Sequence, residues 1–476
     1  MVTTQTSQTP PPPISDRQLN LTIATLGVGA IASILDSTIV NVAVGHLSTV
    51  FHAELTHTQW VITGFLLAMT AIVPLSGWMI DRFGGRATWL LSLSVFFIGS
   101  ILCGIAWNLN SLIVFRVIQG LGAGLILPAL MTLLTQAAGK ARLMTAMSSF
   151  ALLVQVGPIL GPVAGGALTD GANWRWLFLV NVPFCVAGIV MALKVLPRHT
   201  PSAQKRSLDI VGLTLLAPAL VALVYGVGNI DATDGLAATN VWIPLMIGAA
   251  LLAGFVGWSL YDGAQALIDV RLFADRGFSV ANGLSILSGF TMFAGLLILP
   301  LYFQAVRGSS IIESGLLLVP QGLGAAVLII FGKKILSSVA ARWKILGGFV
   351  AMAVGTIPFA FAGAREMTWL LILALFVRGL GIGASTPAIS AIAVAGLPSD
   401  QIARGTTAFN IVQRVGAPFG TTLVAVILAR ALATAGSGVE DIAGAYGVAF
   451  WWTIAFTVLP VALTFLLPAK QVHSTH

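Results

Sequence analysis

Charged residues are scarce in this chain. Only 8% of its 476 residues are Asp, Glu, Lys or Arg, whereas soluble domains carry about 25%. Hydrophobic residues make up 57% of the chain, and the mean hydropathy is +0.96. Because so few charges cannot cover a surface exposed to water, the composition excludes a soluble enzyme and indicates a protein that crosses a membrane many times.

Cysteine and histidine are also scarce. Cys103 and Cys185 each lie inside an apolar run, so we expect two buried thiols and not a disulfide. None of the six histidines falls within an expected membrane span. Three of them, His46, His52 and His57, crowd one loop, which we interpret as solvated; a metal or pH-sensing site there is the alternative. Without a nucleophile–base set or a metal cluster at membrane depth, we expect no enzyme activity, no metal and no cofactor.

Long apolar runs recur along the whole chain. About 20 apolar residues cross a bilayer as a helix, and glycine and proline are tolerated in such helices. No ten-residue alternating pattern recurs, so a β-barrel is not expected. The fourteen expected spans are 20–43, 58–80, 86–106, 111–137, 143–169, 174–195, 208–229, 240–261, 277–304, 313–335, 343–363, 368–396, 404–430 and 446–467.

The positions of lysine and arginine predict the orientation. Of the 24 basic residues, seventeen fall in the two tails and the loops on one side, and four fall at loop edges on the other side. The remaining three, Arg116, Arg378 and Arg414, lie inside spans. The positive-inside rule then places both termini in the cytosol. We therefore expect a multi-pass protein of the cytoplasmic (inner) membrane, whose basic balance reflects topology and not nucleic-acid binding.

Two stretches of the chain repeat at one spacing. Residues 120–128 return at 379–387, and residues 150–161 return at 409–420, both 259 positions later. The repeats predict an all-α membrane protein with two pseudo-symmetric six-helix bundles and two extra helices. Parallel repeats with a site between them are typical of transporters. The expected parts are an N-terminal tail (1–19), an N-terminal bundle (20–200), a two-helix insertion (201–265), a C-terminal bundle (266–468) and a C-terminal tail (469–476).

One expected span carries a single acid, Asp36. A charge at the bilayer centre costs at least about 2.5–3.5 kcal/mol, so such a residue normally faces a protein interior and has a partner. Asp36 lies some sixteen residues into its span, about 24 Å at 1.5 Å per residue. Arg116 lies about two turns into a span of opposite direction, so both charges fall in the same half of the membrane. We therefore predict that they pair; a fixed structural pair or two snorkelling side chains is the alternative.

Two glycine-containing motifs accompany this pair. The first is a short turn between expected spans, with Gly77, Asp81, Arg82, Gly84 and Arg86. Its glycines permit a tight turn, and its charges suit a latch that forms in one conformation only; ordinary positive-inside charge is the alternative.

The second motif lies in the expected span 143–169. Small residues at a spacing of four allow two helices to approach closely, and the two prolines favour a kink. A packing face without a mechanistic role is the alternative interpretation. Its members are Gly157, Pro158, Gly161, Pro162, Gly165 and Gly166.

These stretches resemble the signature motifs of the major facilitator superfamily. Together with fourteen spans, and with the stretches 35–41 and 174–183, they resemble its drug–proton antiporter branch. One departure is Gly85, where the family pattern usually has a second basic residue. The resemblance implies that Asp36 is the proton-coupling acid and that Arg116 is its partner.

A substrate cavity is expected between the bundles. Aromatic and amide side chains there would hold flat amphipathic molecules loosely, although half or more of the aromatic residues are expected to serve packing. The candidate lining residues are Asn41, Trp60, Phe65, Gln119, Gln155, Phe290, Phe293, Asn410, Gln413 and Arg414.

The favoured hypothesis is a monomeric, proton-coupled exporter of small amphipathic molecules that works by alternating access. Its partners would be its substrates, protons and the lipid bilayer, with the proton gradient as energy source and no nucleic acid. The alternative is a transporter of the same fold that exports only a lipid, a siderophore or an anionic metabolite. It is suggested by the excess of arginine inside the expected spans, which hold three arginines but one aspartate. A channel would have no use for paired, protonatable charges.

Overall fold

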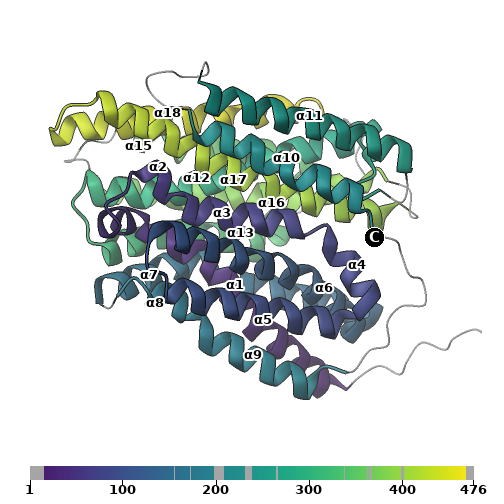
Figure 1. Cartoon of the computed structure of the whole chain (residues 1–476). Coiled ribbons are helices and arrows are strands. Elements are labelled where there is room, and N and C mark those ends of the chain that lie inside the picture. Colours follow the sequence, from purple (N-terminus) through teal and green to yellow (C-terminus); the bar gives the residue numbers. More distant parts are fainter. Residues whose placement is uncertain are drawn as a thin grey trace, which may run out of the picture.

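The computed structural model of the chain is helical throughout its described part (Figure 1). That part comprises residues 15–154, 156–171, 173–197, 208–230, 238–263, 266–336, 338–361, 363, 367–397 and 401–467. Helices are required here because a bilayer offers the backbone no hydrogen-bonding partners, so each span must satisfy its own N–H and C=O groups. The N-terminal helices are α1 (Asp16–Val50), α2 (Leu55–Thr58), α3 (Trp60–Ile72), α4 (Leu75–Phe83), α5 (Gly85–Gly104), α6 (Leu109–Val154), α7 (Val156–Gly171), α8 (Trp176–Leu179) and α9 (Asn181–Val195).

The remaining helices come after α9 in the chain. They are α10 (Ile210–Gly228), α11 (Thr239–Asp262), the short 3₁₀ helix η3 (Val270–Ala274), α12 (Arg276–Ala305), α13 (Ile311–Ile335), α14 (Ala341–Val354), α15 (Ile357–Phe361), α16 (Thr368–Ala395), α17 (Ile402–Thr434) and α18 (Val439–Thr464).

Thirteen helical segments among the described residues are long and apolar enough to cross a membrane. Each of them overlaps one of the fourteen expected spans. The other expected span, 143–169, includes residue 155 and many side chains that lie outside the described part, so fourteen remains a prediction. Two boundaries differ clearly from expectation: the expected span 58–80 is divided between α3 and α4, and α6 continues as helix to Val154. The intervening sequence AGKAR at 138–142 contains no proline to stop it.

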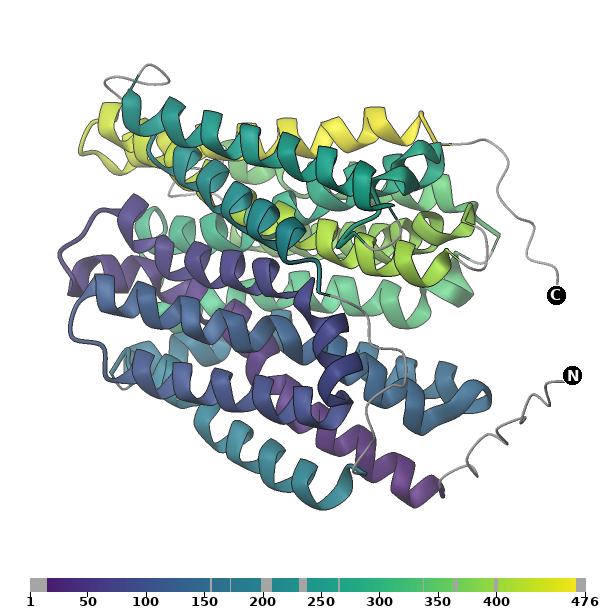
Figure 2. The same cartoon turned by 45° about the vertical axis from the view of Figure 1, so that its right-hand side comes forward.

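The helices form two bundles, α1–α9 and α12–α18, which lie one above the other in Figures 1 and 2. The same pairs pack in both. Helix α6 packs on α3 and α5, as α16 packs on α13 and α14, and α1 packs on α7 as α12 packs on α17. The halves meet through α7 with α13, α3 with α17, and α1 with α12. This arrangement confirms the predicted fold of two pseudo-symmetric bundles.

Glycine explains why the sequence repeat is also a structural repeat. In α6, Gly120 and Gly124 lie against the backbone carbonyls of Phe65 and Met69 in α3, where a Cβ would collide. The two glycines 259 residues later in α16 lie in the same way against the backbone of α13. Small residues let helix backbones approach closely inside a membrane, where packing and not hydrophobicity holds helices together.

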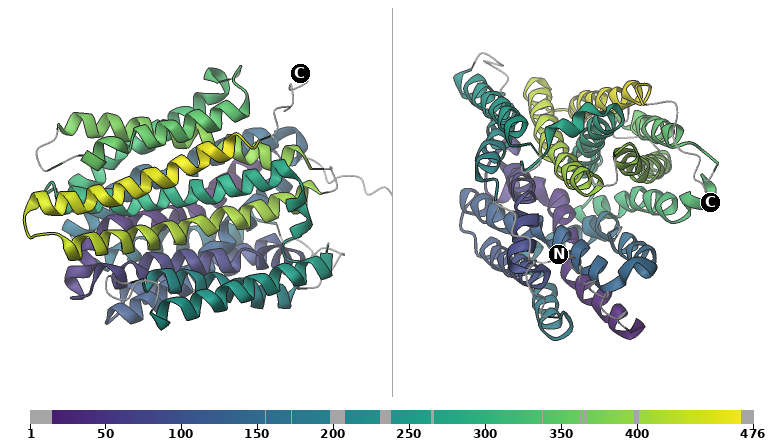
Figure 3. Two further views of the ribbon diagram at one scale, coloured as in Figure 1. Left: turned by 90° about the horizontal axis from the view of Figure 1, so that it is seen from above. Right: turned by 90° about the vertical axis from the view of Figure 1, so that its right-hand side faces the viewer.

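Helices α10 and α11 lie outside both bundles. They pack on each other, and α10 also contacts α3 of the first bundle and α17 of the second. The end-on view in Figure 3 shows this pair at the side of the molecule, along the seam between the halves.

The two halves are joined at one end of the molecule. Here, Gln304 Nε2 donates to the Val42 carbonyl at 2.8 Å, and Gln59 Nε2 donates to Thr422 Oγ1 at 3.3 Å. We name this end, where α1 and α10 finish and α3 and α6 begin, the Trp60 end. The opposite end, with the turn at Gly84, is the Gly84 end.

Candidate functional site: a buried carboxylate–guanidinium pair

Asp36 of α1 is fully buried inside the N-terminal bundle. Its Oδ2 lies 2.5 Å from Nη1 of Arg116, which is only 1% exposed. Its Oδ1 accepts hydrogen bonds from Asn181 Nδ2 at 2.7 Å and from Gln119 Nε2 at 3.0 Å. The predicted pair is therefore present, and the carboxylate has three donors, as a buried charge requires.

Arg116 is held by further neighbours. Its Nε donates to the Val61 carbonyl of α3 at 2.9 Å, and Nη1 also donates to Gln119 Oε1 at 2.7 Å. The guanidinium lies 4.0 Å from the centre of the Phe65 ring, a cation–π contact. These contacts anchor Arg116 to α3 and α6 and leave Asp36 as its link to α1.

Two residues of this network were not predicted as site residues. Asn181 opens α9 and donates to Asp36, and Ser100 of α5 accepts from Gln119 Nε2 at 2.8 Å. For Ser100 the only sequence signal was a hydroxyl within an apolar run, which is common in spans, whereas Asn181 also lies in the stretch 174–183 that resembles the antiporter branch. With them, the network draws on α1, α3, α5, α6 and α9.

The small residues of α7 lie beside Asp36. Gly157 packs against Ile34 and Gly161 against Thr38, both on α1 within a turn of Asp36. Thr38 Oγ1 donates to the Gly157 carbonyl at 3.0 Å. Gly165 also packs on α1.

The next glycine of α7 packs against the C-terminal half of the protein. Gly166 meets the backbone of Ile311 and Ile312 on α13, and Gly315 of α13 lies against the backbone of Pro162. Helix α7 thus sits between the helix that carries the carboxylate and the C-terminal half. The side chain of Pro158 lies outside the described part.

The turn at the Gly84 end is tight. Gly84 has φ +82°, which favours glycine, and it separates α4 from α5. Arg86 Nη2 donates to the Leu193 carbonyl in the last turn of α9 at 2.8 Å, whereas Arg82 and Gly77 are exposed. The described residues form two ion pairs, Asp36–Arg116 and Asp16–Arg142, so Asp81 has no ionic partner among them. A latch role for this turn stays a prediction.

The predicted cavity residues of the first half do not form one lining. Phe65 and Gln119 belong to the network around Arg116. Asn41 is buried and donates to carbonyls of its own helix at Ser37 and Thr38. The ring of Trp60 lies against Tyr225 of α10. Gln155 lies outside the described residues.

The predicted cavity residues of the second half are more scattered. Phe290 is buried and packs on a phenylalanine of α18, with ring centres 4.6 Å apart. Phe293, Gln413 and Arg414 are half-buried, and Asn410 is exposed. The Arg414 carbonyl accepts from Thr70 of α3 at 3.3 Å, which places this stretch of α17 at the seam. Their role as a cavity lining stays a prediction.

The C-terminal half buries an arginine of its own. Arg378 occupies the position 259 residues after Gln119, next to the repeated glycines, and is 1% exposed. Its Nη1 donates to Gln321 Oε1 at 2.5 Å and its Nη2 to the Thr291 carbonyl at 2.8 Å. No carboxylate of the described residues bonds to it.

The family is decided by comparison with known proteins. The sequence-family model of the major facilitator superfamily matches residues 26–421 of this chain. The chain belongs to the major facilitator superfamily. This multi-pass membrane protein is 37% identical, over 85% of its length and 76% of the relative's, to the multidrug resistance protein B homolog of Mycobacterium tuberculosis strain H37Rv. It is 28% identical to the multidrug export protein EmrB of Escherichia coli K12, over 86% of this chain and 80% of that one.

Solved structures of other transporters share this fold. A bacterial homologue of the human lysosomal transporter Spinster, in an inward-facing and unoccupied conformation, superposes with a TM-score of 0.65 at 17% identity. That match covers 95% of this chain and 98% of the other. A peptide transporter gives a TM-score of 0.67 at 14% identity, over 93% and 95% of the two chains. At such identities the likeness concerns the fold alone.

Proposed function

We propose that this member of the superfamily exports small amphipathic molecules from the cell in exchange for protons. The observation that carries the proposal is the Asp36–Arg116 pair, buried at 0% and 1% exposure in a membrane bundle. A charge at such depth is costly and usually functional. The names of the relatives, a multidrug resistance protein and a multidrug export protein, support the class of substrate.

The pair supplies a proton-dependent choice between two conformations. In the described conformation, α1 is tied to α3 and α6 through Arg116 and its partners, and the halves are joined at the Trp60 end. A proton on Asp36 cancels its charge and removes the ionic attraction to Arg116. The conformation that keeps the pair together then loses stability relative to one that separates it. Any coupled switch needs such a difference between two states.

Helix α7 suits the transmission of this change. It packs on α1 around Asp36 and on α13 of the opposite half. A displacement of α1 therefore moves a helix that also forms the seam between the halves. Alternating access would follow as the two bundles rock about the site.

We further propose that both termini face the cytosol, so that the Trp60 end faces outward. The excess of lysine and arginine in the loops of the Gly84 end supports this orientation. Cysteines introduced singly at positions 202 and 234 test it: an impermeant thiol reagent added outside should react at 234 and not at 202. The reverse pattern would invert the topology.

A second candidate function is the export of a dedicated lipid, siderophore or anionic metabolite. It is favoured by Arg414, which lies half-buried in α17 at the seam and forms no ion pair within the described residues. This candidate uses the same Asp36–Arg116 pair and differs only in the cargo.

Transport by purified protein in liposomes distinguishes these functions. Protein oriented with its cytosolic face outward should concentrate an amphipathic dye such as ethidium when the lumen is made acidic, and should not do so without a pH difference. Asp36→Asn should abolish this uptake. Uptake of an anionic metabolite but of no dye would support the dedicated exporter, whereas flux that ignores the pH difference would overturn proton exchange.

A further inference from the structure

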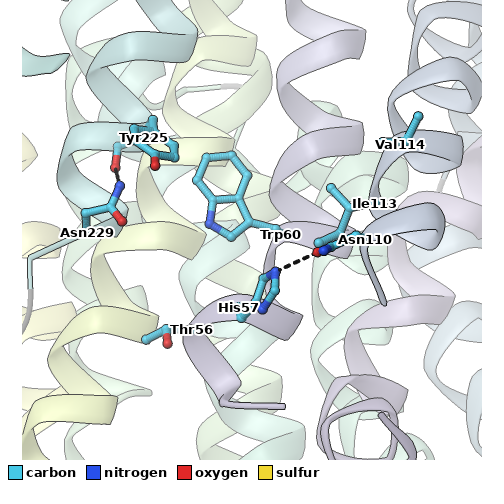
Figure 4. Close-up of a pocket in the computed structure, with 9 residues that line it drawn as sticks. Thr56, His57, Trp60, Asn110, Ile113, Val114, Tyr225 and Asn229 are labelled. Atoms are coloured by element: carbon cyan, nitrogen blue, oxygen red, sulfur yellow. Dashed lines mark hydrogen bonds between the residues drawn. The ribbon is translucent and has the colours of Figure 1, made fainter. Parts of the chain in front are cut away.

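A cavity of about 510 Å³ lies at the Trp60 end, between α10 and the N-terminal bundle (Figure 4). Ligand pockets in proteins typically enclose about 300–1,000 Å³. We name it the α10 pocket. Its lining residues are Thr56, His57, Trp60, Asn110, Ile113, Val114, Tyr225, Gly228 and Asn229.

The α10 pocket has an aromatic wall and an opening to lipid. The rings of Trp60 and Tyr225 lie 5.9 Å apart at 49°, and both line the pocket. Ile113 and Val114 continue the apolar surface, and Val114 is 56% exposed on the flank of α6. A flat hydrophobic molecule in the membrane can therefore enter sideways and stack on the rings.

Histidine and amide side chains form the rim. His57 Nε2 and Asn110 Oδ1 lie 3.1 Å apart, and Asn229 Nδ2 donates to the Tyr225 carbonyl at 2.8 Å (Figure 4). The lining contains no Lys, Arg, Asp or Glu. Phosphate groups are usually bound by lysine or arginine, so this lining suits a planar aromatic molecule with a small polar end better than a lipid phosphate. The indole face of Trp60 can also bind a cation.

The α10 pocket adjoins the seam between the halves. Gln59, next to Trp60, donates to Thr422 of α17, and Thr63 one turn on contacts the same hydroxyl at 3.3 Å. A Cβ on Gly228 would lie 3.3 Å from Thr422 Cγ2 and 3.4 Å from Trp60 Cζ2. Three helices thus meet at Gly228, where α3 and α17 must part if the Trp60 end opens.

We propose that the α10 pocket binds planar aromatic amphiphiles and holds the exported compound beside the seam at the Trp60 end. The identification of the ligand with the exported compound rests on the proposed function; the binding itself does not. The site depends on α10, which supplies Tyr225, Gly228 and Asn229. One helix of the pair outside the two repeats would therefore help to bind the ligand.

Protection of an introduced cysteine tests the binding. Val114→Cys places a thiol in the α10 pocket, and both native cysteines are fully buried, so they add little background. In nanodiscs, ethidium should slow labelling of Val114→Cys by a small maleimide at least about threefold. The matched control is Val190→Cys on the exposed flank of α9, where ethidium should have no effect. Tyr225→Ala should weaken protection by about fivefold, since ring stacking of this size is lost, whereas Tyr261→Ala, an exposed ring on α11, should not.

The outcomes separate the α10 pocket from the transport mechanism. Protection that persists in the Asp36→Asn variant supports a site independent of proton coupling, whatever that variant does to transport. Equal protection at positions 114 and 190 would mean general partitioning into lipid and would overturn the proposal. Protection by a short-chain phospholipid but not by ethidium would assign the α10 pocket to lipid and would also overturn it.

Discussion

Replacing Asp36 with asparagine gives the most direct test of the coupling mechanism. The substitution keeps the size of the side chain but removes its charge and its titration. The asparagine oxygen can still accept from both Asn181 and Gln119, which donate to the same carboxylate oxygen of Asp36, but the amide N–H₂ group then faces Nη1 of Arg116 in place of an acceptor. Arg116 then keeps the Val61 carbonyl, the Gln119 oxygen and its contacts with the Phe65 and Phe178 rings.

The expected magnitude follows from the burial of both groups. Removing one partner of a buried ion pair costs about 3–5 kcal/mol, because it leaves an uncompensated charge. At about 1.4 kcal/mol per factor of ten, this shifts the balance away from the paired conformation by at least about a hundredfold. Asp36→Asn should therefore favour the conformation in which Arg116 is released, and a proton gradient should no longer change that preference.

Two transport modes separate coupling from general damage. In liposomes, Asp36→Asn should lose ethidium accumulation driven by a pH difference but should retain exchange of labelled for unlabelled ethidium, which needs no net proton movement. A second variant, Asp36→Asn with Arg116→Leu, removes the unpaired guanidinium. It should recover most of the thermal stability that Asp36→Asn loses, and it should remain uncoupled. If Asp36→Asn still concentrated ethidium in response to a pH difference, the carrier would be another group and the mechanism would be wrong.

Three further substitutions probe other parts of the structure. Asp81→Asn should lower the rate of transport severalfold while leaving ethidium binding nearly unchanged, because a latch at this turn would bias a conformational change without touching cargo; a loss of affinity at an unchanged rate would contradict a latch. Phe293→Ala should alter relative export rates across several dyes more than the maximal rate of any one, and an unchanged spectrum would remove Phe293 from the cavity. Gly161→Val should lower the melting temperature and transport together, because its side chain would collide with Thr38 on α1; Gly347→Ala, where the added carbon meets nothing within 4 Å, is the control.

Much of the fold was predictable because the bilayer restricts the choices. Long apolar runs must be helices when backbone groups have no water to bind, so thirteen of the expected spans could be placed from hydropathy alone. The glycine repeats predicted two similar halves because each glycine is a point of backbone contact. The end of α6 was not predictable in the same way, since no local residue forces a break at 138–142.

The candidate site was predictable only in its charged members. A lone acid and a buried arginine at similar depth are conspicuous because each is costly without the other. Asn181, although it lies in the stretch 174–183 that resembles the antiporter branch, and Ser100 were both missed as site residues, since neutral polar side chains are common in spans and their inclusion depends on how α5 and α9 pack. Phe65 and Gln119 were expected beside substrate, and the structure places both on Arg116. The depth of both residues in the membrane could be predicted from the sequence. Which neighbour each side chain contacts depends on the direction in which it points, and that follows from the packing of the helices.

The two halves differ in the group that accompanies each buried arginine. The repeated glycines place Arg378 where the first half has Gln119, and the contacts of Gly157 and Gly416 with α1 and α12 place Ser288 where the first half has Asp36. The second half thus buries a guanidinium against neutral acceptors, Gln321 and the Thr291 carbonyl. Arginine stays protonated in proteins and amides do not titrate, so this arrangement has no charge that a pH difference can change. If transport is coupled to protons as proposed, the coupled motion would begin in the first half, at the Asp36–Arg116 pair on α1 and α6, and reach the second half through the helices at the seam.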